Sequence, residues 1–407
     1  MSPFPRLAFR NVARNRRRSL ITLAAVLLGV TAVISVRGIT YGFLRLMVDD
    51  VVRGRTGALQ VHAAGYMDSV DALPLEPNFA YDEALLARVR SVPGVTGASG
   101  RLAFAGLVSN GVSQTTFVGR GLDLAHEREA VPRFGFEVRK GGRALTAQDY
   151  ANALLGSELG RSFQVEPKGR VTLAASSPRG RANSLDVVVE GLSESSLPFE
   201  NKRVATVPLK LAQDLLGMEG RVTELAVAVE DLGELERVAE DLRAALGPGY
   251  EVDTWQELQP FVRDIIRRQK FMLALVSSIL FVIILTGIIN TMLMSVFERV
   301  REVGTMLAVG VRRLQVLRLF LLEAVVLGMA GGLGGVGLGA AIVGLLGARG
   351  IPIENIGTGG PVMLRPELDL PFAALAFCVA VVGALIAAAW PAWRASRLNP
   401  VDALRSN

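Results

Sequence analysis

The sequence predicts an α-helical membrane protein with four transmembrane helices, one plus three, and a large mixed α/β extracytoplasmic domain inserted between helices 1 and 2. Three observations predict this fold. Half of the 407 residues are hydrophobic while only 20% are charged. The mean hydropathy is +0.38. Four long stretches contain no Asp, Glu, Lys or Arg. High apolar content with low net charge also excludes a disordered chain.

The charge-free stretches have 18, 27, 25 and 24 residues, and they are Ser19–Val36, Phe271–Phe297, Ala324–Ala348 and Leu370–Trp393. Because about 20 apolar residues span a hydrocarbon core as a helix, each is long enough to cross. The predicted helices are 19–40, 263–297 (which includes an outer stalk), 319–348 and 370–393. The first run follows three arginines, as in a signal peptide, but no small-x-small cleavage pattern follows it, so a retained helix is expected.

Basic residues set the predicted orientation. The segments 1–18, 298–318 and 394–407 together hold fourteen arginines, whereas the short loop 349–369 holds two. Positive charge accumulates on the cytoplasmic side of inner-membrane proteins. We therefore expect both termini and the 298–318 segment in the cytoplasm. The basic pI of 9.8 comes from this edge and is no indication of nucleic-acid binding.

Residues 41–262 are predicted to form the extracytoplasmic domain. Two amphipathic helices are expected, at 81–92 and 232–246, and each ends at a Pro/Gly break that precedes a strand. Strand candidates are Leu102–Val108, Thr115–Val118, Asp186–Glu190 and Thr223–Val229. This repetition predicts one subdomain from segments of about 41–125 and 221–262, with about 126–220 inserted between them.

The second apolar helix is expected to begin well before the membrane. From Pro260 to Arg299 the pattern is compatible with a single helix of about 60 Å, twice the hydrocarbon thickness. Movement at one end of such a helix must appear at the other. Residues Ile39–Val52 are expected to extend the first helix in the same way.

Motifs for catalysis are scarce. A single cysteine, Cys378, and two histidines offer neither a disulfide framework nor a Cys/His metal site. None of the five lysines precedes Ser or Thr, so the sequence contains no P-loop. The run Gly332–Gly337 matches the dinucleotide fingerprint but lies inside an apolar helix, where its small-xxx-small spacing favours helix packing, with dimerisation as one version of it. We expect no catalytic residue, metal or cofactor in this chain.

The segment Glu298–Gly310 is the most informative cytoplasmic stretch. Thr305–Val309 is apolar, lies outside the predicted spans, and has charges of both signs nearby. One interpretation is a solvated juxtamembrane loop. The other is a docking surface for a partner groove. The residues alone leave both open.

This stretch, with Phe320-Leu321-Leu322-Glu323 at the start of the third helix, resembles the MacB/FtsX-type ABC permease family. Two further segments are similar to that family: the Arg10–Arg18 lead-in and the closing motif from Trp390 to Arg405, where Trp390 replaces the usual Tyr. The size of the outer domain and the Gly57–His62 stretch look most similar to lipoprotein-releasing (LolC/LolE-type) and MacB-type permeases.

The resemblance implies a mechanism. A separate cytoplasmic ATPase, which carries the ATP and Mg, grips the segment after the second helix, and its closure moves the long helices and changes the outer domain. The implied ATPase-coupling residues are Glu298, Arg299, Arg301, Glu302, Gly304, Thr305, Met306, Leu307, Ala308 and Gly310. A second permease subunit, identical or paralogous, completes the dimer.

In the lipoprotein-releasing branch an acylated protein enters between the outer parts of the helices. Candidate contacts are Phe43, Met47, Val48, Phe271, Met272, Leu275, Ile279 and Ile283. Ordinary packing or lipid exposure is the alternative for these side chains. Asn290 and Thr291 are expected to bond a neighbouring helix, and Glu323 to pair with Arg313 or Arg318 or to snorkel.

The resulting hypothesis is an inner-membrane permease subunit that releases or exports lipoproteins or other amphiphiles. A periplasmic carrier or adaptor is a further implied partner. Alternatives are a MacB-like drug or peptide exporter, an FtsX-like regulator that activates a cell-wall hydrolase, and a membrane-anchored binding or sensory protein without an ATPase.

Overall fold

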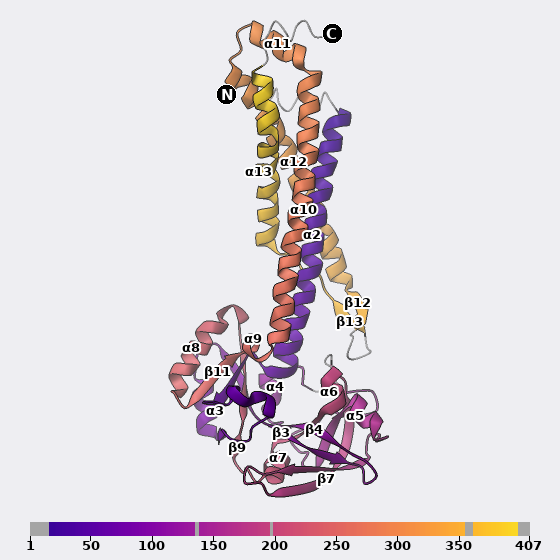
Figure 1. Cartoon of the computed structure of the whole chain (residues 1–407), viewed down its shortest axis with the longest axis vertical. Coiled ribbons are helices and arrows are strands. Elements are labelled where there is room, and N and C mark those ends of the chain that lie inside the picture. Colours follow the sequence, from indigo (N-terminus) through magenta and orange to yellow (C-terminus); the bar gives the residue numbers. More distant parts are fainter. Residues whose placement is uncertain (1–15, 135–137, 196–197, 355–360, 398–407) are drawn as a thin grey trace. The chain divides into compact units, whose positions relative to one another are not determined.

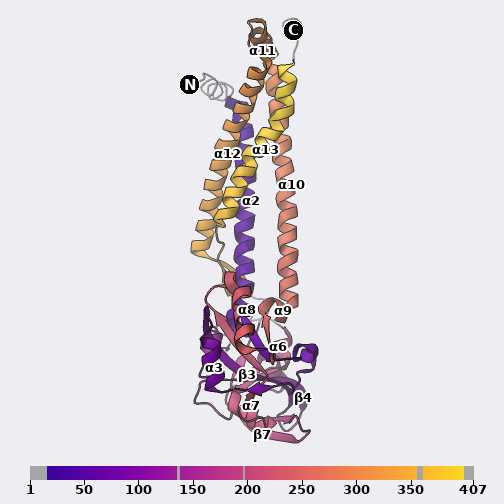
Figure 2. The ribbon, with the colours of Figure 1, turned by 90° about the vertical axis from the view of Figure 1, so that its left-hand side faces the viewer.

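Four long helices dominate the computed structural model, which describes residues 16–134, 138–195, 198–354 and 361–397. They are α2 (Arg16–Val51), α10 (Pro260–Glu298), α12 (Arg313–Arg349) and α13 (Leu370–Ser396). Each is long and apolar enough to cross a membrane. Figures 1 and 2 show them running lengthwise in one bundle. The four charge-free stretches of the sequence all lie inside these helices. The lead-in up to residue 15 and the closing motif beyond residue 397 lie outside the described residues.

Two of these helices continue past their apolar runs. At 1.5 Å per residue the 39 residues of α10 span about 58 Å. The predicted long helix is therefore present, and it ends one residue earlier than expected. The first helix also extends as expected, to Val51, and a π-helical turn, η1 (Val52–Thr56), follows it.

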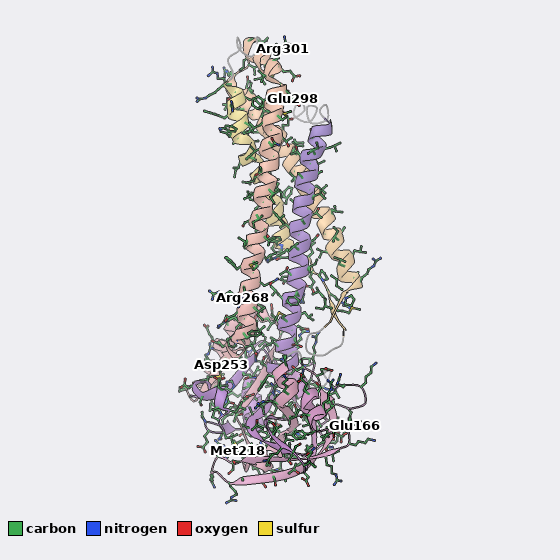
Figure 3. The ribbon with its side chains drawn as sticks, turned by 45° about the vertical axis from the view of Figure 1, so that its right-hand side comes forward. Glu166, Met218, Asp253, Arg268, Glu298 and Arg301 are labelled. Atoms are coloured by element: carbon green, nitrogen blue, oxygen red, sulfur yellow. The ribbon has the colours of Figure 1, made fainter. Side chains whose placement is uncertain are left out.

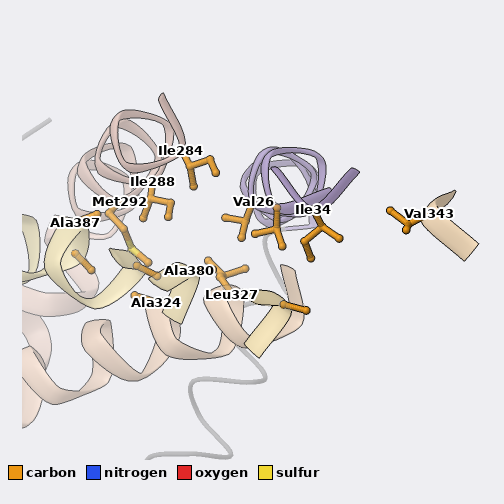
Figure 4. Close-up of a cluster of buried hydrophobic side chains, with 14 residues drawn as sticks. Val26, Ile34, Ile284, Ile288, Met292, Ala324, Leu327, Val343, Ala380 and Ala387 are labelled. Atoms are coloured by element: carbon orange, nitrogen blue, oxygen red, sulfur yellow. The ribbon is translucent and has the colours of Figure 1, made fainter. Parts of the chain in front are cut away.

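Small residues let α12 approach its neighbours closely. A Cβ placed on Gly335 would lie 2.7 Å from Cβ of Val30 on α2, and one on Gly339 would lie 2.9 Å from Cβ of Ile34. Gly328, two turns before Gly335, approaches Ala384 of α13 in the same way. The predicted packing role is confirmed, and these glycines serve it within one chain. Figure 4 shows the buried cluster that the four helices form around this contact.

The chain between α2 and α10 forms a sheet domain, residues Leu46–Asp264 with Ile353–Val362. Nine strands make one sheet in the order β11-β1-β10-β3-β4-β8-β5-β7-β6. These strands are β1 (Leu59–Ala63), β3 (Val95–Ser109), β4 (Gln114–Leu122), β5 (Asn152–Gly156), β6 (Arg170–Ser176), β7 (Ala182–Ser193), β8 (Val204–Pro208), β10 (Glu224–Val229) and β11 (Tyr250–Thr254). All four predicted strands are confirmed, three of them with longer bounds, while β10 begins one residue later than predicted.

Shorter elements connect the strands. The helices are α3 (Glu83–Arg90), α4 (Glu127–Ala130), α5 (Ser157–Ser162), α6 (Pro198–Arg203), α7 (Leu209–Leu216), α8 (Leu235–Leu246) and α9 (Trp255–Leu258), with 3₁₀ turns η2 (Met67–Ala72) and η3 (Leu232–Glu234). Two small sheets pair β2 (Phe79–Ala80) with β9 (Arg221–Val222) and β12 (Ile351–Glu354) with β13 (Pro361–Leu364). The helices predicted at 81–92 and 232–246 are confirmed as α3 and as η3 with α8.

The part of the large sheet from β3 to β6 closes on itself. The last residues of β3, Gly106–Ser109, pair with Thr172–Ala175 of β6, which joins the two ends of the series β3-β4-β8-β5-β7-β6. The result is a closed six-stranded β-barrel, which we call the ring. A Cβ on Gly106 would lie 2.5 Å from the carbonyl oxygen of Ala174, so glycine permits this close pairing.

The other end of the sheet is an open, antiparallel group. It contains β11, β1, β10 and the first half of β3, and α3 and α8 pack against it. Because β3 is fifteen residues long, it belongs both to this group and to the ring. The ring therefore uses strands from both segments that the sequence analysis divided at about residue 125, and one sheet links the two predicted subdomains.

Candidate functional site

The segment predicted to contact an ATPase contains a helix of its own, α11 (Val300–Ala308). Arg299 separates it from α10 with φ −112° and ψ 13°. Gly310 adopts φ 96°, a left-handed conformation that favours glycine and ends the element. Within the predicted coupling segment 298–318, residues 300–308 are helical and residues 313–318 already belong to α12.

One face of α11 packs into its own protein. Val303 is fully buried, together with Val296, Val316, Phe320 and Ala395 from the other helices. Two residues that were predicted to contact the partner, Met306 and Leu307, are only partly exposed and pack against this cluster. Spacings of three and four residues place these side chains on a single face of the helix. The cluster therefore fixes how α11 sits on α10, α12 and α13.

A buried ion pair reinforces this arrangement. Nη1 of Arg299 lies 3.2 Å from Oε2 of Glu323, and Nε lies 2.9 Å from Oε2 of Glu302. The guanidinium also lies above the Phe320 ring, 5.6 Å from its centroid. The expected partner of Glu323 was Arg313 or Arg318. The structure pairs Glu323 with Arg299, which the sequence analysis did not name and which lies at the break between α10 and α11.

Apart from the half-buried Met306 and Leu307, the coupling residues divide into two groups. Arg299 and Gly304 are buried and hold α11 in place. The exposed residues are Glu298, Arg301, Glu302, Thr305, Ala308 and Gly310. Glu298 and Arg301 are labelled in Figure 3, at the α11 end of the bundle. Val309, which the sequence analysis did not select, is 82% exposed and adds an apolar contact to this mixed-charge surface.

We call these seven exposed residues the α11 surface. It combines charges of both signs with an exposed valine on a helix whose opposite face is fixed. Such a surface is suited to a groove on another protein, where an apolar contact gives affinity and flanking charges fix the register. Val309 belongs to the apolar Thr305–Val309 stretch of the sequence analysis, although it was not among the implied coupling residues.

The candidate substrate contacts are exposed to different degrees. On α10, five of them form a stripe with spacings of three and four residues, and Phe271 and Ile283 are 67% and 61% exposed. On α2, Phe43 is exposed while Met47 and Val48 are half-buried. The structure shows an apolar stripe along α10, and the role of these residues stays a prediction.

Two polar residues of α10 differ from expectation. Oγ1 of Thr291 donates to the carbonyl oxygen of Gly287, 2.8 Å away in the same helix. Asn290 is exposed and, among the described residues, bonds no neighbouring helix. A helical threonine readily satisfies its hydroxyl on the preceding turn, so the predicted bond of Thr291 to another helix is wrong.

The sheet domain holds buried ion pairs that sequence reasoning missed. Arg101 forms a two-point pair with Glu127 in its interior. Glu200 lies between Arg55 and Arg120 and also accepts from Ser195, 2.5 Å away. The charged partners in these ion pairs lie 26 to 145 positions apart in the sequence, so no local sequence pattern predicts them.

Residues 19–245 match the family model of the MacB-like periplasmic core domain, which is more than half of the chain. The chain belongs to this family. Residues 274–400 also match the FtsX-like permease C-terminal model, and that match contains α11 and all of α12 and α13. The chain is therefore a MacB/FtsX-type permease, as its motifs indicated.

Similar proteins cover almost the whole chain. The macrolide export ATP-binding/permease protein MacB of Wolinella succinogenes is 28% identical over 98% of this chain and 60% of its own length. MacB of Sodalis glossinidius is 26% identical with the same coverage. The chain thus spans about 60% of the length of these relatives. An uncharacterized ABC transporter permease of Methanocaldococcus jannaschii is 22% identical over 98% of this chain and 96% of its own length.

Part of the chain is also similar to two solved domains of transporter proteins. The extracellular domain of the transporter YknZ from Gram-positive bacteria has a TM-score of 0.35 and 15% identity, covering 48% of this chain and 99% of that domain. The periplasmic region of MacB from Actinobacillus actinomycetemcomitans has a TM-score of 0.37 and 10% identity, covering 50% of this chain and 92% of that region.

Proposed function

We propose that this chain is the permease subunit of an ABC transporter and that a separate cytoplasmic ATPase docks on the α11 surface. The observation that carries the proposal is the two-sided character of α11. One face is fixed to α10, α12 and α13 by the Val303 cluster and the Arg299–Glu323 pair. The opposite face presents Val309 and charges of both signs. A partner that moves α11 must therefore move α10 with it.

The long helix α10 would transmit movement from α11 to the sheet domain. α10 is continuous from Pro260 to Glu298, and the chain reaches it from β11 through α9. The start of α9 is fixed, because Thr254 and Glu257 form a reciprocal capping box. Displacement of α11 is thereby transmitted along a rigid helix toward the strands of the sheet domain. We propose that the sheet domain changes shape in response.

The charge distribution supports a membrane topology for this mechanism. Segments 1–18, 298–318 and 394–407 hold fourteen arginines against two in 349–369, and this asymmetry favours a cytoplasmic position for α11 and both termini. The first helix then crosses outward and the sheet domain lies on the outer face of the inner membrane. The remaining three helices complete the one-plus-three arrangement.

We propose amphiphilic molecules at the outer face of the inner membrane as the substrates. The exposed apolar stripe of α10 supports this class, and the relatives in Wolinella and Sodalis are named for macrolide export. Release of lipoproteins, as in LolC/LolE-type permeases, is the second candidate and draws on the same stripe. ATP and Mg belong to the partner ATPase in either case, and a second permease subunit completes the assembly.

Co-purification tests the docking surface. The full chain is purified in detergent from its native cell, and mass spectrometry identifies any bound ABC ATPase. The variant Val309→Asp should lose that ATPase, because it places a charge on the exposed apolar contact. Val112→Asp is the matched control, since Val112 is 95% exposed in the β3–β4 turn. Retention of the ATPase by Val309→Asp at the wild-type ratio contradicts the assignment.

A regulator resembling FtsX differs in a measurable way. In that case the sheet domain recruits a cell-wall hydrolase and the assembly moves no substrate. Mass spectrometry of the same preparation distinguishes the two functions, because a bound hydrolase favours regulation whereas a bound lipidated or amphiphilic cargo favours transport.

A further inference from the structure

An open cleft of about 870 Å³ lies in the sheet domain. Its walls come from three separate parts of the chain: the segment before β2, the turn between β6 and β7, and the segment from the end of α7 to β9. Met218, which is labelled in Figure 3, is one of its lining residues. The volume is within the range of known ligand sites.

The cleft carries an excess of positive charge. Arg179, Arg181 and Arg221 all line it. The guanidinium of Arg221 donates to the side chain and to the backbone carbonyl of Asn78, which is neutral. Within the described ranges, no carboxylate forms an ion pair with any of these three arginines.

The acidic residues at the cleft compensate little of this charge. Asp214 already accepts a hydrogen bond from the Tyr150 hydroxyl, 2.7 Å away, and lies 2.9 Å from Nζ of Lys210. Burial raises the pKa of Asp214, but the bonds from Tyr150 and Lys210 outweigh that effect and lower it, so the carboxylate is ionised and neutralised by the lysine. Glu76 is the other carboxylate among the described residues that line the cleft.

The turn that carries Arg179 and Arg181 is held in one conformation by its own hydrogen bonds. The backbone N–H of Ser177 donates to the carbonyl oxygen of Arg181 at 2.8 Å, and the N–H of Arg181 donates to Oγ of Ser177 at 3.1 Å. Gly180 supplies the positive φ of 75° that the turn requires. Both arginines are therefore presented at low entropic cost.

We propose that this cleft binds an acidic segment of a partner protein, whose carboxylates pair with Arg179, Arg181 and Arg221. A guanidinium forms two parallel hydrogen bonds to one carboxylate. Two of these groups lie on the turn between β6 and β7 and the third lies in β9, on another wall of the cleft. This arrangement matches a chain with several spaced carboxylates better than a single small anion. The site goes beyond the proposed function, because it lies entirely within the sheet domain and requires no ATPase.

Fluorescence anisotropy with a fluorescein-labelled hexaglutamate peptide tests the proposal on the full chain in detergent. Wild-type protein should bind the peptide, and binding should weaken with added salt because the pairs are exposed. The variant Arg179→Glu/Arg181→Glu should raise Kd about tenfold or more, since two exposed pairs become repulsive. Its melting temperature should not change, because both side chains are exposed.

The control is Arg161→Glu/Arg170→Glu, which reverses the same charge at two exposed arginines that do not line the cleft. This control should bind hexaglutamate as the wild type does. An equal loss in both double variants, or no loss in Arg179→Glu/Arg181→Glu, overturns the proposal. Competition by equimolar inorganic phosphate also overturns it, because the site then recognises simple anions rather than an acidic chain.

Discussion

The helical bundle and the sheet domain are stabilised in different ways. In the bundle, glycines of α12 approach Val30 and Ile34 of α2, and apolar side chains of all four helices form a buried cluster. In the sheet domain, arginines and glutamates are buried as ion pairs between distant strands and helices. Close packing is the principal source of helix association in lipid. Buried ion pairs contribute little net stability but depend strongly on geometry.

The pair of Arg299 with Glu323 is an exception to this division, because it is a buried ion pair within the bundle. It lies where α11 joins α10, and both of its side chains are buried rather than part of the α11 surface. We propose that this geometry-dependent contact fixes the direction in which α11 moves α10. The comparison therefore assigns a positioning role to Arg299 and a packing role to the glycines.

Removal of Arg299 should have the largest effect. Arg299→Ala leaves Glu323 buried without this partner, and breaking a buried pair typically costs about 3–5 kcal/mol. We expect a lower melting temperature in detergent and loss of the bound ATPase. The double variant Arg299→Met/Glu323→Leu should recover the melting temperature but not ATPase-coupled transport. Recovery of both by the double variant contradicts a positioning role.

Gly335→Leu should destabilise the bundle by an intermediate amount. The added side chain meets Val30 and the carbonyl oxygen of Leu27, 2.7 and 2.8 Å from the new Cβ. Overpacking of this kind costs about 1–3 kcal/mol. Gly337→Leu is the control, because no atom lies within 4 Å of its added Cβ. Thermal unfolding in detergent measures the melting temperatures of both variants. Equal melting temperatures would contradict a packing role for Gly335.

The sheet domain should respond to acid through Glu200. Burial raises its pKa, but Arg120 and Arg55 outweigh that effect and lower it from 4.5 to about 2. A lowered folded-state pKa contributes stability that is present above pH 4.5 and is lost as pH falls toward 2. Glu200→Gln should therefore be less stable than wild type at neutral pH and show a weaker pH dependence between 4.5 and 2. Identical pH profiles in thermal unfolding would exclude this contribution.

The exposed pair of Arg143 with Asp149 should have the smallest effect. The two side chains form two hydrogen bonds of 2.7 and 2.8 Å, but the Arg143 side chain is 49% exposed. Exposed pairs contribute about 0.2–1 kcal/mol. Arg143→Ala should therefore shift the melting temperature slightly, and less in high salt. A loss as large as that of Arg299→Ala would contradict the distinction between buried and exposed pairs.

The sequence predicted the bundle far better than the sheet domain. Charge-free runs are local, so the helices and the extension of α10 to Pro260 followed from composition and length. Strands such as β10 were also recognisable one by one. Their order was not, because the pairing of β3 with β6 joins residues more than sixty positions apart and depends on the ring as a whole.

The candidate site was predicted in part for the same reason. The family-like motif located the α10–α12 connection, yet it could not separate buried from exposed residues. Arg299 and Arg301 have the same chemistry and lie two positions apart. The structure buries the Arg299 side chain against Glu323 and leaves Arg301 exposed.

Distance measurements within the sheet domain test the proposed relay most directly. Spin labels are placed by cysteine substitution at two exposed positions, Arg161 on α5 and Glu236 on α8, in a Cys378→Ser background. The chain is reconstituted with its ATPase. Pulsed electron–electron double resonance then measures the distance between the two labels in the nucleotide-free assembly and in one trapped by ADP and vanadate. We predict a shifted distance distribution in the trapped assembly, and no shift after Val309→Asp. An unchanged distribution in a trapped wild-type assembly with active ATPase would contradict the relay of motion from α11 to the sheet domain.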